Sequence, residues 1–136
     1  MSTSIEFMNP EGLVKNPAFS HVAITKGNGN TIYIGGQNAI TDDQEIVGKG
    51  DIALQTEFVL ENIEAILDDC DATLDDLFKL NIYIVQGQDV RKGFQGAQSF
   101  LGKLKNPPVI TGVVVAGLAN PDYLVEIEAV AFKKTK

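Results

Sequence analysis

The sequence predicts a single α+β domain over residues 1–136, in which one mixed sheet carries two helices on one of its faces. Three observations predict it. The candidate elements follow the order strand, strand, helix, strand, helix, strand, strand. Two segments place apolar residues at helical spacing, while the others are short and rich in β-branched and aromatic residues. The composition, 44% hydrophobic and 21% charged, suits one domain with a buried core.

The N-terminal part predicts a hairpin. Two prolines and a glycine interrupt the segment up to Pro17, so we expect that segment to lie extended on the surface. A strand is expected over 21–25. Residues 27–30 (GNGN) tolerate positive φ, as a tight turn requires, and 31–36 (TIYIGG) would be the returning strand. The polar, glycine-containing stretch 41–50 predicts a loop.

The first helix is expected over 51–70. Asp51 is a suitable N-cap because its carboxylate can accept from free amides of the first turn. Cys70 ends the apolar stripe, which indicates a small core residue rather than a nucleophile. The stripe consists of Ile52, Val59, Ile63, Ile66, Leu67 and Cys70.

A turn over 71–76, with a short helical turn opening at Thr73, leads into the third strand at 77–85 (LFKLNIYIV). The second helix is expected over 89–103, although Gly93 and Gly96 each weaken it by roughly 1 kcal/mol relative to alanine. Pro107-Pro108 ends that region. The last two strands are expected over 109–118 and 124–133, joined by a turn at Asn120-Pro121-Asp122.

The last strand is apolar on both faces. Val125, Ile127, Ala129 and Ala131 point one way, and the helices can cover only one face of the sheet. The opposite face still carries apolar residues in this strand and at Tyr83 and Val85. An uncovered apolar sheet face is typical of a partner surface, so the pattern predicts a homo-oligomer. The residues expected on that face are Leu124, Glu126, Glu128, Val130 and Phe132.

Charge and composition limit the partners. The formal net charge of −7 disfavours binding to nucleic acid and to anionic membranes. The N-terminus has no signal-peptide pattern, and no apolar run is long enough to cross a bilayer, so we expect a cytoplasmic protein. One cysteine and one histidine cannot build a metal site alone. No cofactor motif is present, and we expect neither metal nor cofactor.

Several segments resemble the RidA/YjgF (reactive intermediate deaminase) superfamily, in the right order and over nearly the whole chain. The most specific are the strand that ends in Gly-Gly-Gln37 and the C-terminal segment 124–131 (LVEIEAVA). The others are 16–20 (NPAFS), 55–62 (QTEFVLEN), the strand after Asp75-Asp76, and Pro107-Pro108.

This resemblance implies a chorismate-mutase-like fold and a homotrimer with ligand clefts between subunits. In deaminating members an arginine grips the substrate carboxylate, and a glutamate of the final strand positions the hydrolytic water. The arginine position holds Ile110 here, and the glutamate position holds Glu126. The resemblance places the remaining ligand contacts at Phe19, Gly36, Thr111 and Gly112.

Two candidates keep a structural alternative. Glu126 is the tentative catalytic residue, as a general base or water-positioning group, but Glu126 and Glu128 could also be charges bonded across a subunit interface. His21, the single histidine, would point the same way as Phe19 and could supply an acid near the cleft, or it could be a surface or interface residue.

The missing arginine decides the functional expectation. Isoleucine offers no bidentate pair to a carboxylate, so an ordinary 2-imino acid should bind poorly. We expect a RidA-like protein that binds a small molecule in an intersubunit cleft and, if it is an enzyme, hydrolyses an imine or enamine. The alternatives are an ordinary 2-aminoacrylate/2-iminobutanoate deaminase and a non-catalytic regulatory or binding module of the type labelled endoribonuclease or translation inhibitor, which the acidic charge disfavours.

Overall fold

The structure, a computed structural model, describes residues 4–135. Its strands and helices alternate along the chain in the predicted manner, with one additional strand at the N-terminus. In order they are β1 (Ile5–Met8), β2 (Val22–Thr25), β3 (Gly29–Gln37), α1 (Ile52–Asp69), the 3-10 helix η1 (Leu74–Asp76), β4 (Leu77–Val85), α2 (Val90–Leu101), β5 (Val109–Val115) and β6 (Val125–Lys134).

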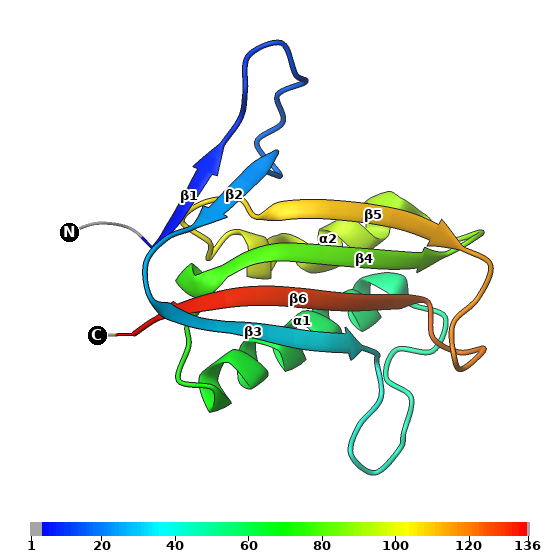
Figure 1. The fold of residues 1–136 in the computed structure, drawn as a ribbon. Coiled ribbons are helices and arrows are strands. Elements are labelled where there is room, and N and C mark those ends of the chain that lie inside the picture. The colour runs from blue at the N-terminus through cyan, green and yellow to red at the C-terminus, as the bar shows by residue number, and fades with distance from the viewer. Residues whose placement is uncertain (1–3, 136) are drawn as a thin grey trace.

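A mixed four-stranded sheet in the order β3-β6-β4-β5 organises the molecule. Strand β6 runs antiparallel to both of its neighbours, and β4 and β5 are parallel. Parallel neighbours need a crossover connection, and α2 supplies it. Both helices lie behind the sheet, whose other face is open toward the viewer in Figure 1. The predicted fold, a mixed sheet with two helices on one face, is confirmed.

The side chains of β6 alternate between the two faces of the sheet, as the sequence predicts. Val125, Ile127, Ala129 and Ala131 are each at most 2% exposed and belong to the core beneath the helices. Phe132 is also buried, although it is expected on the other face, because its ring lies against Gly29. The rest of that second face is only partly covered within the chain.

Helix α1 begins as predicted and is fixed to the loop before β6. The Asp51 side chain accepts a hydrogen bond from the Leu54 amide at 3.1 Å, which confirms the N-cap. Gln55 is fully buried, and its amide donates to the Asp122 carbonyl at 2.9 Å and accepts from the Leu124 amide at 2.8 Å. Its side chain therefore fixes where β6 starts relative to the helix.

The predicted N-terminal hairpin is wrong. Strand β2 pairs with β1 in a separate two-stranded ribbon, which stands off one end of the sheet in Figure 1, and β3 pairs with β6. Gly29 and Asn30, expected in the turn, are the first residues of β3, so the chain does not reverse tightly there. The long partner β6 offers β3 seven paired positions, whereas β1 and β2 share four.

Cys70 is exposed, not a core residue as expected. Helix α1 ends at Asp69, and the Cys70 amide bonds back to the Ile66 and Leu67 carbonyls. Asp71 then adopts a positive φ of 56°, which turns the chain away from the helix axis. The thiol therefore lies beyond the last residue that the apolar face buries, Leu67.

Candidate functional site

Two carboxylates lie on the open face of β6, as predicted. Glu126 and Glu128 are two residues apart, so their side chains point to the same side of the sheet. Across the antiparallel ladder, Tyr83 is the partner of Glu126 and Asn81 is the partner of Glu128. Both carboxylates are partly buried, in contrast to the alternating core residues of the same strand.

Glu128 is held by two side chains of β4. Its Oε1 accepts from the Tyr83 hydroxyl at 2.7 Å and from the Asn81 amide at 2.9 Å. The hydrogen bond from Tyr83, followed by that from Asn81, lowers the pKa of Glu128 below its ordinary value. The same bond raises the pKa of Tyr83. Glu128 is therefore an anchored anion, which makes it a poor proton acceptor in a reaction.

Glu126 has a different environment. Its Oε1 accepts from the Asn38 amide at 3.0 Å, and Asn38 follows the end of β3. Its Oε2 lies where a side chain at Gly36 would start, since a Cβ built there would stand only 2.9 Å from the Glu126 Cγ. A register shift between Ile34 and Gln37 brings Gly36 to this place. Glycine at position 36 therefore leaves room for the carboxylate, whose orientation Asn38 fixes.

Ile110 and Gly112 lie on the other face of the sheet. In the parallel ladder Ile110 is the partner of Leu80, and Gly112 is the partner of Ile82. All four line a cavity of about 200 Å³ between the sheet and α2. Thr111 alternates with them and has Asn81 as its partner, so it faces the open side with the carboxylates.

Phe19 lines the same cavity as Ile110, and His21 lies next to Phe19. Ser20 ties this segment to the start of β5, because its amide donates to the Pro108 carbonyl at 2.9 Å and its hydroxyl to the Pro107 carbonyl at 2.6 Å. Phe19 thereby lines the apolar cavity. The rings of Phe19 and His21 meet edge to face at 5.4 Å, which confirms that they point the same way. The His21 Nε2 lies 2.6 Å from the Val14 carbonyl oxygen.

The predicted site residues thus form two groups within one chain. Gly36, Glu126 and Thr111 lie on the open face, whereas Phe19, Ile110 and Gly112 border the cavity on the helix side. The only arginine of the sequence, Arg91, lies in the first turn of α2 with 92% of its side chain exposed, 3.8 Å from Asp89. Within the described residues it does not take the place of an arginine at position 110, because it lies on the helix surface.

Residues 4–135 contain no group of three metal-ligating side chains of the His, Cys, Asp or Glu type. In the same part of the chain, no helix has both the length and the apolar character needed to cross a membrane.

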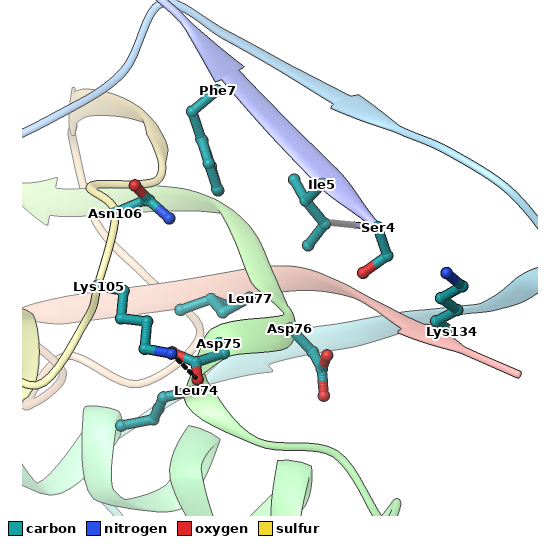
Figure 2. A pocket seen from close by; sticks show the side chains of 10 residues that line it. All are labelled: Ser4, Ile5, Phe7, Leu74, Asp75, Asp76, Leu77, Lys105, Asn106 and Lys134. Atoms are coloured by element: carbon teal, nitrogen blue, oxygen red, sulfur yellow. Dashed lines mark ion pairs between the residues drawn. The ribbon is translucent and has the colours of Figure 1, made fainter. Parts of the chain in front are cut away.

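A second hollow, of about 410 Å³, lies beside β1 at the other end of the sheet (Figure 2). None of the predicted site residues lines it. Its acidic residues already have partners, since Asp75 lies 3.7 Å from the Lys105 ammonium and Asp76 accepts from the Thr73 amide at 2.9 Å. This hollow is therefore not the candidate site.

The sequence did not reveal four residues that lie beside the predicted site residues. They are Asn38, Asn81, Tyr83 as a hydrogen-bond donor, and Thr56. The Asn38–Glu126 bond joins residues 88 positions apart, which no local pattern reveals. Thr56 did carry a signal, because it is a polar residue beside the apolar stripe of α1, and it is 4% exposed.

The chain has close relatives of known family. The family model described as Endoribonuclease L-PSP matches residues 13–133. A RutC family protein of Pyrococcus abyssi is 37% identical over 106 residues, which make up 78% of this chain and 81% of that protein. The 3-aminoacrylate deaminase RutC of Acinetobacter baylyi is 30% identical, over 93% of this chain and 96% of its own length. The crystal structure of YyfB from Yersinia pestis, described as a protein of unknown function of the conserved Rid family, superimposes with a TM-score of 0.84 at 31% identity, covering 95% of this chain and 98% of that one.

Proposed function

Because this chain belongs to the RidA/YjgF superfamily, we propose that it binds a small uncharged molecule in a cleft between two subunits and hydrolyses an imine or enamine there. The observation that carries this proposal is the position of the two site groups. Ile110 with Gly112 and Glu126 with Gly36 lie on opposite faces of one sheet, so a single ligand can meet both only across a subunit interface.

The open sheet face supports such an interface. Tyr33 on β3 is 80% exposed and Val113 on β5 is 43% exposed, and both lie on the face that bears Glu126. Exposed apolar surface on a sheet face favours a second copy of the chain over water. A homotrimer with inward-facing sheets would cover this face and bring the Glu126 group of one subunit to the Ile110 group of the next.

The proposed reaction needs water and a proton acceptor. Water adds to the carbon of the C=N bond, and the resulting amino alcohol breaks its C–N bond to give a carbonyl compound and ammonia. Glu126 would pass one proton from the attacking water to the nitrogen to form the amino alcohol, and then pass the hydroxyl proton to the same nitrogen so that it leaves as ammonia. Asn38 holds Oε1, and the absence of a side chain at Gly36 leaves room for Oε2. An enamine would first shift its proton to become the imine.

The apolar wall around Ile110 favours an uncharged substrate. A hydrogen bond to a charged group contributes about 1.5–3 kcal/mol, and the isoleucine side chain offers none to a carboxylate. Phe19, Gly112 and the core residues behind them add no positive charge. A substrate carboxylate would therefore lose water there without receiving a partner.

A second function is supported by one relative. The Acinetobacter baylyi protein named 3-aminoacrylate deaminase matches 93% of this chain, and its name describes deamination of an enamine that carries a carboxylate. An ordinary 2-aminoacrylate or 2-iminobutanoate deaminase would use the same glutamate, but would need another cation for the carboxylate. A role in binding or cleaving RNA agrees less well with the net charge of −7.

Imine hydrolysis can be tested directly. Phenylmethanimine, an uncharged imine formed in situ by oxidation of benzylamine, is followed by ammonia release with and without the protein. We expect the protein to accelerate hydrolysis. Glu126→Gln should lower the rate of the protein-catalysed reaction by at least about 100-fold, as expected for loss of a general base. A wild-type protein without acceleration, or a Glu126→Gln variant as active as wild type, would overturn the proposed reaction.

A further inference from the structure

The cavity behind Ile110 extends deep between α2 and the sheet. Its floor is formed by buried residues such as Leu80, Val125 and Ile127, each 1% exposed. Phe94 of α2, 48% exposed, and Gly112, also exposed, lie on its outer side. The cavity therefore runs from the surface beside β5 into the hydrophobic core.

Thr56 is the one residue with a polar side chain among those that line the described cavity. It lies on α1, is 4% exposed, and its Oγ1 is a buried atom for which the structure contains no hydrogen-bond partner. A threonine inside a helix commonly donates to the carbonyl four residues earlier, and this one does not. A hydroxyl can both donate and accept, so the residues that line the cavity include one buried polar group without a partner.

Gly93 keeps the space beside this hydroxyl open. A Cβ built at Gly93 would lie 3.8 Å from the Thr56 Oγ1 and 3.4 Å from the Ile52 Cδ1. These are ordinary contact distances, so a side chain at position 93 is tolerated by the backbone and would fill the cavity. The absence of one, within a helix where glycine is unfavourable, leaves the volume available to another molecule.

The volume sets the size of that molecule. An apolar cavity of about 150 Å³ stays dry and accepts benzene. The cavity here is about 200 Å³, which suits one aromatic ring or a short branched alkyl chain with one further group. Its walls are aliphatic and aromatic apart from Thr56, so a charged group would be strongly disfavoured.

We propose that this cavity is the specificity pocket for a small uncharged ligand, whose ring-sized apolar body fills the space under α2 and whose single hydrogen-bonding group reaches the Thr56 hydroxyl. This inference rests on the proposed function, because the pocket adjoins Ile110 and Gly112 at the proposed cleft. It names the substrate class as neutral, apolar and carrying one polar group at its buried end.

Phenol and toluene, two probes of nearly equal shape, test the pocket by NMR titration of the full-length protein. We expect both to shift the amide signals of residues around Phe94 and Leu80, and phenol to bind about tenfold more tightly because it can hydrogen-bond to Thr56. Thr56→Val, which keeps the side-chain shape, should reduce that ratio to about one. Its melting temperature should be at or above that of the wild type, because the unsatisfied hydroxyl is gone.

Gly93→Leu is the second variant, and it should abolish binding of both probes by filling the cavity. Three outcomes would each contradict the proposed pocket. They are equal binding of phenol and toluene to the wild type, an unchanged preference for phenol in Thr56→Val, and no binding of either probe by the wild type. Hydrolysis of phenylmethanimine is measured on the same samples. Probe binding without hydrolysis would refute the reaction and retain the pocket, whereas hydrolysis with a probe preference independent of Thr56 would refute the pocket alone.

Discussion

Ile110 and Glu126 lie on opposite faces of the four-stranded sheet. Ile110 is paired with Leu80 above the core, while Glu126 is paired with Tyr83 on the open face. No rotation of either side chain can bring the two to one ligand within a single chain, since the sheet lies between them. A site that uses both must therefore be built from two subunits, and several consequences can be measured.

Mixed oligomers should recover activity from two inactive parents. Glu126→Gln damages the polar group, and Gly112→Phe obstructs the apolar group without a backbone clash, because nothing lies within 4 Å of a Cβ at position 112. In a cyclic trimer containing both variants, one cleft in three combines two intact groups. Doubly tagged heterotrimers should therefore show about one third of the wild-type imine hydrolysis.

The two parent variants, each purified alone in the same way, serve as controls and should be nearly inactive. Mixed trimers as inactive as their parents would mean that each cleft takes both groups from the same chain, contrary to the geometry.

A charge on the open face should separate the subunits. Val113 is 43% exposed and lies beside Tyr83 on the face we expect to be covered by a second copy. Val113→Glu adds a carboxylate to the face that bears Glu126, two strands away from it, so the proposed trimer should dissociate to monomers in light scattering coupled to size exclusion. Leu54→Glu is a matched control, because Leu54 is 44% exposed but lies on α1, on the helix side. A trimeric Val113→Glu protein, or a monomeric wild type, would contradict the interface.

The Tyr83–Glu128 hydrogen bond should stabilise the fold over a defined pH range. The folded-state pKa of Glu128 is lowered, so its contribution is present above the unfolded value of about 4.3 and is lost as pH falls through the folded pKa. The pKa of Tyr83 is raised, so its contribution is present below about 10 and is lost as pH rises through the folded pKa. Tyr83→Phe should therefore lower the free energy of unfolding at neutral pH and converge with wild type at both extremes.

Urea denaturation across the pH range measures this difference. Tyr33→Phe is the control, since Tyr33 is 80% exposed on the same face. A Tyr83→Phe deficit that stays constant with pH would mean that lost packing, not the hydrogen bond, causes it.

Asn38 should act on turnover more than on binding. Its amide fixes one oxygen of Glu126 at 3.0 Å, so Asn38→Ala leaves the carboxylate free to rotate. Loss of one such bond in the transition state should reduce kcat for imine hydrolysis about tenfold, with KM nearly unchanged. Asn30→Ala, at an exposed position near the start of β3, should have no effect. A rise in KM at constant kcat would instead assign Asn38 to substrate binding.

Much of the fold could be predicted because it depends on local pattern. Strand β4 has the predicted bounds, and α1 begins after the predicted cap at Asp51, since apolar spacing and capping are encoded within a few residues. The ribbon of β1 and β2 could not be predicted in the same way. Its pairing joins Ile5 to Thr25 across a segment without regular structure, and the glycines at 27 and 29 favoured a hairpin that the longer ladder with β6 outcompetes.

The site could be predicted in part. Alternation along the last strand placed Glu126 and Glu128 together on one face, and the structure agrees. The sequence pattern could not show that Ile110 would face the helices, because the side to which Ile110 points depends on the register of β5 against β4. The sequence could not show that the Thr56 hydroxyl lacks a hydrogen-bond partner, because this depends on how α2 and the sheet pack around it.

The most direct test compares kcat/KM for an uncharged imine and for a 2-imino acid, in the wild type and in Ile110→Arg. The substrates are phenylmethanimine and 2-iminobutanoate, each formed in situ by an oxidase. We expect the wild type to prefer phenylmethanimine, and Ile110→Arg to improve hydrolysis of 2-iminobutanoate by about tenfold or more, because a guanidinium at position 110 can pair with the carboxylate. A wild-type protein that hydrolyses 2-iminobutanoate more efficiently than phenylmethanimine, with no gain from Ile110→Arg, would contradict the assignment of an uncharged substrate.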